Sequence, residues 1–262
     1  MSPFFADIER VIEAVLIFVR ISGIVFALPV FGDQPVPVRT RLMLSVALAF
    51  AVAPMMDGRY LSRIPNDVIL LGIIVFKELL IGLLVGFIAR TAFAGILMGA
   101  SIVAYQMGFG TANLIMPDFD AHIDSFSAFH RVFVMSIFLG LDLHHVFLRA
   151  MFRSFEVVPA GAAVVHGNLA MLLIKATAGL FMVAMQLAAP LLIALLFTMA
   201  ALGLVSRAVP QMNVFTMSFP ASFFVGLMIY IATLSLYPNW ITSHIHLTEE
   251  SMWLTLRGMA SR

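Results

Sequence analysis

The chain has 262 residues, of which 62% are hydrophobic and 11% charged, with a formal net charge of +1 and no cysteine. Soluble domains are usually about 45–50% apolar, so this composition indicates an integral membrane protein. The lack of cysteine excludes disulfides, thiolate nucleophiles and thiolate metal sites, and the absence of any basic run argues against nucleic acid as a partner.

The first two apolar segments are 11–28 and 42–56. A membrane-spanning helix needs about 20 mostly apolar residues, and the first segment approaches this length while carrying Glu13 and Arg20. These two residues are two helical turns apart, so they lie on roughly one face of a helix. The second segment is short, and we expect Pro54 to break it near its end.

The next two apolar segments, 68–89 and 91–105, are separated only by Arg90. The first of them is interrupted by the adjacent charges Lys77 and Glu78. Neighbouring positions on a helix point about 100° apart, so these side chains cannot both face the same groove. We therefore expect each to find its partner on another element or on another subunit.

Three further apolar segments are 132–141, 176–206 and 212–236. We expect Pro190 to kink or divide the second of these, and Pro220 to break the third. Charges and prolines inside apolar segments favour helices that pack against protein rather than lipid. The sequence therefore predicts an all-α, polytopic membrane-type protein with kinked and broken helices.

Two small-xxx-small patterns, Gly82 to Gly86 and Gly95 to Gly99, lie in neighbouring segments. Glycines at this spacing let two helices approach closely enough for backbone contact. We therefore expect these segments to pack tightly.

The stretch after Gln106 begins with two closely spaced glycines and ends at the start of 118–131, the most polar internal connection. We expect a loop here, although it is unusually apolar for one. An apolar loop at membrane depth must be buried or fill a cavity, and flexible methionine side chains can seal an irregular opening. The expected loop comprises Met107, Gly108, Phe109, Gly110, Thr111, Ala112, Asn113, Leu114, Ile115, Met116 and Pro117.

Seven histidines invite a metal site, above all His144 and His145 beside Asp142, and the pair His244 and His246. No His-Glu-x-x-His pattern is present, and neighbouring histidines on a helix should diverge too far to bind one ion easily. No nucleophile-elbow motif accompanies any serine, histidine and aspartate. We expect no catalytic residue, no bound metal and no cofactor.

A polar cluster at 206–215 separates two long stretches that contain no other charged residue. It carries Arg207, Pro210, Gln211 and Asn213. Polar groups left unsatisfied in hydrocarbon are costly, so this cluster needs protein partners or a water-filled cavity.

The string Ser-Arg-Ala-Val-Pro-Gln-Met-Asn-Val-Phe of this cluster, followed by Pro220 and Gly226, resembles the hallmark of the FliR family. That family is the export-gate subunit of the bacterial flagellar type III secretion apparatus. Further blocks resemble the family in the same order along the chain. They are Arg20-Ile-Ser-Gly to Pro29-Val-Phe-Gly32 with Pro37 and Arg39, Lys77-Glu78-Leu-Leu-Ile-Gly82 with Gly86-Phe87, Gln106-Met-Gly-Phe-Gly110, His145 through Ser154-Phe155 to Pro159-Ala-Gly161, and Pro190.

Three positions depart from the family pattern. Ala100-Ser101 stands where most relatives carry an acidic or amide residue, and Pro117-Asp118 reverses the usual Asp-Pro order. The stretch 218–222 lacks the lysine of the family's Gly-Phe-Pro-Leu-Lys. The last departure weakens any contact assigned to that lysine.

The resemblance implies a single export-gate domain, 1–262, with a FliP-like part at about 1–170 and a FliQ-like part at about 171–262. It implies assembly with FliP and FliQ, and with other export-apparatus membrane proteins, in the bacterial inner membrane at the flagellar basal body. Exported flagellar proteins would be transient substrates, and the chain would not be an enzyme. The residues expected to pack against neighbouring subunits are Lys77, Glu78, Gly82, Gly86, Arg207, Pro210, Gln211 and Asn213.

In the family, the loop at 107–117 is expected to act as a plug in the closed pore. Our hypothesis is that its apolar members seal the passage, while Gly108 and Gly110 allow the loop to move aside. The sealing residues would be Met107, Phe109, Leu114, Ile115 and Met116.

Two alternatives stay open. One is the virulence-type counterpart in an injectisome, which shares fold and chemistry but exports effectors. The other is an ion-coupled transporter that uses Glu13, Glu78 and Arg207 as buried functional charges. Internal inverted repeats would favour a transporter, and the sequence contains none.

Overall fold

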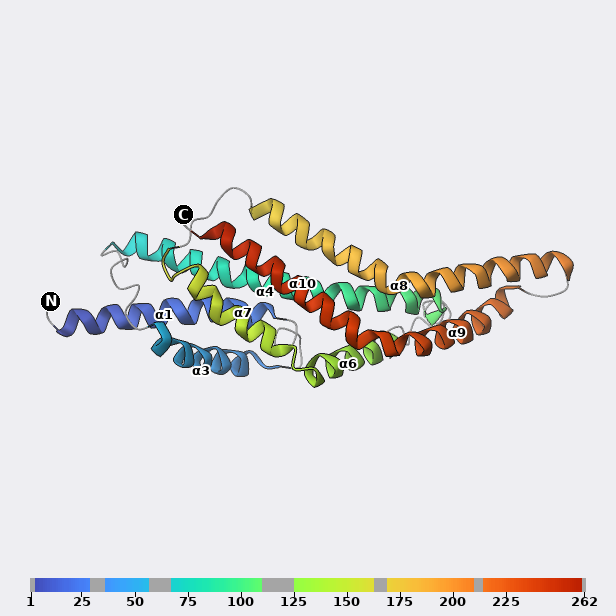
Figure 1. The fold of residues 1–262 in the computed structure, drawn as a ribbon, viewed down its shortest axis with the longest axis horizontal. Helices are drawn as coiled ribbons and strands as arrows, with labels where there is room; N and C mark the ends of the chain where they lie inside the picture. Colours follow the sequence, from blue (N-terminus) through green and yellow to red (C-terminus); the bar gives the residue numbers. More distant parts are fainter. Residues whose placement is uncertain are drawn as a thin grey trace. The chain divides into compact units, whose positions relative to one another are not determined.

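The computed structural model describes residues 3–28, 36–56, 67–109, 125–162, 169–209 and 214–260. Within these ranges the chain forms α-helices and one short 3-10 helix, without a β-strand (Figure 1). The all-α fold class is thus confirmed. The elements are α1 (Pro3–Ala27), α3 (Val38–Met56), α4 (Val68–Gln106), α6 (Ser125–Gly140), α7 (His144–Val157), α8 (Leu169–Ala208), α9 (Val214–Thr233), η2 (Leu234–Leu236) and α10 (Tyr237–Met259).

Three helical stretches of the described chain are long and apolar enough to cross a membrane: Val68–Gln106, Met171–Ala208 and Met217–Met259. A fourth arises if α6 and α7, which meet at a bend of 66°, are taken together as one broken span. These lengths and compositions agree with the predicted polytopic membrane-type chain.

Helix α4 is one continuous helix of 39 residues, not the two segments predicted on either side of Arg90. At 1.5 Å per residue it is about 58 Å long, well beyond the roughly 30 Å of a bilayer's hydrocarbon core. The charges do not interrupt it because Arg90 is exposed and Glu78 is buried with a partner from another helix.

The three prolines predicted to disturb helices have different effects. Pro190 lies near the middle of α8, which continues past it, and Figure 1 shows this helix changing direction in its middle. It is therefore kinked rather than divided. Pro220 lies inside α9 without ending it, so the predicted break there is wrong. Pro54 does precede the end of α3, as predicted.

Two segment assignments need correction. The predicted polar connection 118–131 is helical from Ser125 onward, because α6 begins there, and its first part lies outside the described residues. The last predicted segment, 212–236, ended too early, since η2 leads directly into α10. Helix α10 has a proline at its second residue, a position that suits proline because the N–H is not needed there.

The described chain divides into two compact units that interleave along the sequence. The first unit comprises Met1–Thr91, His144–Ala176 and Ile245–Arg262, and the second comprises Ala92–Leu143 and Thr177–His244. Helices α4, α8 and α10 each contribute residues to both. The predicted FliP-like and FliQ-like parts were defined by resemblance to other proteins. The compact units do not test that resemblance, so the two parts stay a prediction.

The two glycine pairs both lie on α4, and each packs against a different helix. Gly82 and Gly86 face α1 in the first unit, while Gly95 and Gly99 face the stretch 180–187 of α8 in the second. A Cβ on Gly95 would lie 2.8 Å from the Leu180 carbonyl oxygen. The glycine patterns thus predict close helix approach correctly, but the two glycine-bearing segments are parts of one helix rather than partners.

Candidate functional site

A fully buried ion pair joins α1 to α4 in the first unit. The Nε atom of Arg20 donates to Oε2 of Glu78 over 2.6 Å, and both side chains are 0% exposed. A buried carboxylate or guanidinium is costly unless it is paired, and further hydrogen bonds to its polar atoms lower that cost. The pair therefore needs further partners from the surrounding chain.

The end of α7 supplies partners for Nη1 of Arg20, whereas Nη2 has no hydrogen-bond partner among the described residues. The Nη1 atom of Arg20 donates to the carbonyl oxygens of Ser154 at 3.0 Å and Val158 at 2.7 Å. The guanidinium carbon also lies 4.3 Å from the centre of the buried Phe155 ring. Carbonyl groups at the end of a helix lack intrahelical partners and carry partial negative charge, so a cation is stabilised there.

Glu78 is held in a second way by the turn that follows α7. Its Oε1 atom accepts a hydrogen bond from the Gly161 backbone N–H at 2.8 Å. Gly161 has a φ of +79°, a left-handed conformation that glycine adopts without strain. We call Arg20, Glu78, Ser154, Val158 and Gly161 the buried charge cluster.

The turn at Gly161 gives a direct test of this arrangement. Alanine at this position must adopt a left-handed φ, which disfavours a non-glycine residue by roughly 1–2 kcal/mol. We expect Gly161→Ala to lower the thermal midpoint of the detergent-solubilised protein, and Gly258→Ala, in a helix with nothing within 4 Å, to leave it unchanged or higher. Equal midpoints for the two variants would contradict the role given to the turn.

Close helix contact brings the partners of the charge cluster together. The Cα of Gly82 is 3.1 Å from where a Cβ on Gly23 would lie, so the two helix backbones touch at this point. A Cβ on Gly82 would collide with the carbonyl oxygen of Arg20, and one on Gly86 would lie 2.9 Å from that of Ile24. The glycines therefore set the distance over which Arg20 reaches Glu78.

Of the predicted subunit-packing residues in the first unit, Glu78, Gly82 and Gly86 make their described contacts within the chain. Lys77 is half-buried on α4 and has no ion pair among the described residues. The sequence did not single out Arg20 as the partner of Glu78. Two features of the sequence could have suggested this pairing. Arg20 and Glu78 are both charged residues inside apolar segments, and each has a glycine nearby, Gly23 and Gly82.

In the second unit, α4 ends at Gln106, where the sequence predicts the loop to begin. The Met107 N–H still donates to Val103 O at 2.9 Å, and Gly108, with a φ of +97°, then turns the chain. Met107 is 0% exposed, and its Cγ, Sδ and Cε atoms cover Gly226 of α9. The described start of the loop therefore packs in the chain's own core.

The remaining predicted loop residues, Gly110 to Pro117, lie outside the described residues, as do Pro210, Gln211 and Asn213. Arg207 is described and exposed in the last turn of α8, where a positive charge is favourable to the helix dipole. The roles assigned to these residues in plugging and subunit packing stay predictions.

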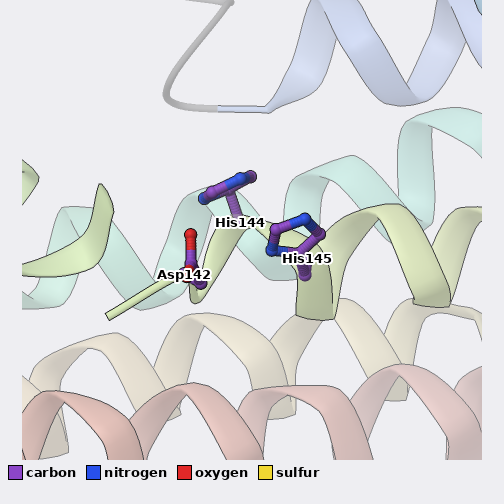
Figure 2. A group of neighbouring side chains, drawn as sticks. All are labelled: Asp142, His144 and His145. Atoms are coloured by element: carbon purple, nitrogen blue, oxygen red, sulfur yellow. The ribbon is translucent and has the colours of Figure 1, made fainter. Parts of the chain in front are cut away.

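The two histidines at the start of α7 do not diverge as predicted. The ring centres of His144 and His145 are 4.2 Å apart, tilted by 34°. Asp142, whose φ is +54°, lies beside them in the turn before α7, and one potential ligand atom of each residue lies within 4.8 Å of the other two (Figure 2). Elsewhere, His244 stacks on Trp240 and His246 lies 3.6 Å from Glu249, so each has its own neighbour.

Large apolar side chains are exposed along the second half of α8 and along α9. Phe197 on α8 is 70% exposed and Met228 on α9 is 71% exposed. From Leu196 to the end of α8 at Ala208, none of the residues is buried. Exposed apolar side chains in this number indicate contact with lipid or with other proteins.

Comparison with known proteins places these features in a family. Residues 11–248 match the family described as bacterial export proteins, family 1. The chain is 30% identical over 231 residues to the flagellar biosynthetic protein FliR of Caulobacter vibrioides, covering 88% of this chain and 92% of that one. It is also 30% identical over 240 residues to FliR of Bacillus subtilis, covering 90% and 92%, and 27% identical over 217 residues to FliR of Escherichia coli K12, covering 83% and 82%. The chain therefore belongs to the FliR family of bacterial export proteins.

Proposed function

We propose that this chain is a subunit of the flagellar type III protein export gate, and that it assembles with FliP and FliQ to form and close the export channel. The gate would lie in the bacterial inner membrane at the flagellar basal body, together with other membrane proteins of the export apparatus. Exported flagellar proteins would pass through it as transient substrates. Membership of the FliR family supports this function.

The observation that carries the assembly part is the uncovered apolar surface of α8 and α9. Side chains such as Leu196, Phe197 and Leu204 project from α8 without cover from the described chain. An ordinary lipid-facing helix has one side against its own protein, whereas this stretch has no buried residue on any side. Neighbouring subunits would supply the missing cover.

The closing part of the proposal concerns 107–117. In this proposal the apolar residues of that segment block the channel between export events, and the glycines Gly108 and Gly110 permit the change of backbone direction. The described end of the segment supports an apolar, protein-embedded position, because Met107 is fully buried.

Neither alternative is favoured by a described contact. The relatives reported above are flagellar proteins, which supports the flagellar apparatus over an injectisome. The ion-coupled transporter would use Glu78 and Arg207 as buried functional charges, whereas Arg207 is exposed and Glu78 is already bound by Arg20 and by the Gly161 N–H.

Co-expression with FliP and FliQ tests the assembly. We expect a tagged chain, extracted in mild detergent, to purify as a hetero-oligomer containing both partners at fixed ratios. A monomer or homo-oligomer, obtained while both partners are shown to be present in the membrane, would refute the proposal and favour the transporter.

Deleting Gly110 to Met116 tests the closing part. We expect the assembled gate carrying this deletion to leak ions through the membrane, because the apolar segment no longer fills the channel. Leakage is measured by cell growth and membrane potential in high-salt medium, with co-purification of both partners as the control for assembly. Unchanged leakage from a normally assembled complex would rule out the plug.

A further inference from the structure

Three potential metal ligands gather in the turn that leads into α7. Asp142, His144 and His145 each offer one ligand atom, and these three atoms all lie within 4.8 Å of one another. Figure 2 shows the carboxylate and both imidazole rings pointing toward one another. All three come from four consecutive residues, so the arrangement is local to this turn and needs no contact with distant parts of the chain.

The spacing of the two histidine rings removes the main objection to a metal site here. Neighbouring histidines were expected to diverge too far to bind one ion, but the ring centres of His144 and His145 lie 4.2 Å apart. Ligand atoms that hold one Zn²⁺ at about 2.0–2.2 Å with tetrahedral angles are roughly 3.3–3.6 Å from one another. Atoms that start within 4.8 Å of one another can reach this spacing by modest side-chain rotations.

Two further features of the turn agree with a bound ion. The Nδ1 atom of His144 is buried and has no hydrogen-bond partner among the described residues. A buried polar atom without a partner is unusual in a folded protein, and an ion or a water at the site is a common explanation. Asp142 has a φ of +54°, and backbone conformations that are rare for residues other than glycine gather at ligand-binding sites.

We propose that Asp142, His144 and His145 bind one divalent transition-metal ion such as Zn²⁺. Two imidazoles and one carboxylate suit Zn²⁺, Co²⁺ or Ni²⁺, whereas Mg²⁺ and Ca²⁺ prefer sites made of oxygen atoms. Three protein ligands leave a fourth position for a water molecule. The ion would hold the turn before α7 in its left-handed form. This site is additional to the proposed export function and does not depend on it.

Titration of the full-length chain with zinc tests the site. The protein is purified in detergent through a tag that contains no histidine, and a chelator is used to remove metal before isothermal titration calorimetry with Zn²⁺. We expect one equivalent of Zn²⁺ to bind per chain. An excess of Mg²⁺ should leave the affinity unchanged, because Mg²⁺ competes poorly for imidazole ligands.

Two substitutions that the fold should tolerate each remove one ligand. His145→Ala changes an exposed residue, and Asp142→Asn introduces a residue type that accepts a left-handed φ. We expect each variant to bind Zn²⁺ at least about tenfold more weakly, since losing even a residue that supports a ligand typically costs about 10–100-fold in affinity.

The matched control is His246→Ala. The His246 ring is 58% exposed and lies 3.6 Å from Glu249, and this pair has no third candidate ligand among the described residues. We expect this variant to bind Zn²⁺ as tightly as the wild type does.

Thermal unfolding gives a second readout, because a ligand that binds only the folded chain raises the thermal midpoint. Zn²⁺ should raise the midpoint of the wild type and of His246→Ala, but not that of His145→Ala. Three outcomes would overturn the site: no zinc bound by the folded wild-type chain, wild-type affinity in both ligand variants, or equal weakening by all three substitutions.

Discussion

Replacing Glu78 by alanine is expected to destabilise the protein by roughly 3–5 kcal/mol, the usual effect of removing one partner of a buried ion pair. The substitution leaves the guanidinium of Arg20, which is 0% exposed, without its carboxylate. It also deprives the Gly161 N–H of its acceptor. The measurement is the thermal midpoint of the detergent-solubilised protein, together with its level in the membrane.

Two controls separate the pairing from the mere loss of a side chain. Lys77→Ala alters the neighbouring half-buried charge and should change stability by no more than about 0.5 kcal/mol. The double variant Arg20→Met/Glu78→Met removes both charges and should be markedly more stable than either single substitution, because no unpaired charge remains. If the double variant were as unstable as the two single variants combined, the ion pair would not be the source of the effect.

Replacing Gly82 by alanine is expected to destabilise the protein by roughly 1–3 kcal/mol through overpacking, although alanine is the better helix former. The new Cβ would collide with the Arg20 carbonyl oxygen and lie 3.1 Å from the Gly23 Cα. Because these are backbone atoms, α1 and α4 must move apart, and the reach of Arg20 to Glu78 lengthens with them.

Gly72→Ala on the same helix is the matched control, since a Cβ there meets nothing within 4 Å. We expect this variant to be more stable by about 0.5–1 kcal/mol, because glycine in a helix interior is less favourable than alanine. The two thermal midpoints should thus shift in opposite directions. A shift of the same sign for both would show that helix propensity, not helix contact, governs the Gly82 position.

The sequence predicts the helical, membrane-type character of this chain well, because long apolar runs have few other structural solutions. The prediction is wrong where a charged residue has a partner that lies far away in the sequence. Glu78 suggested an interruption in α4, but its partner Arg20 is 58 residues earlier in the chain. Nothing in the residues around Glu78 reveals that partner.

In the candidate sites too, local features are predicted correctly and contacts between distant residues are not. Paired glycines predicted the end of α4 at Gln106 and close helix contacts at Gly82 and Gly86 correctly, since glycine's lack of a side chain acts locally. That Met107 lies on Gly226 could not be foreseen, because the contact depends on how α4 and α9 pack. Helix α10 was not predicted because it contains polar residues such as Glu249 and Glu250, so it does not form a long apolar segment.

The interleaving of the two units has a consequence for biosynthesis. The first unit draws on the stretch from Ile245 onward, and the second draws on residues as late as His244. Domains generally fold in the order in which they leave the ribosome, but neither unit here has all its parts until the chain has been translated to His244 or beyond. During synthesis, early helices such as α1 are made well before the stretch from Ile245 onward that completes their unit. The first unit therefore becomes complete only after the second, once the stretch from Ile245 to Arg262 has been translated.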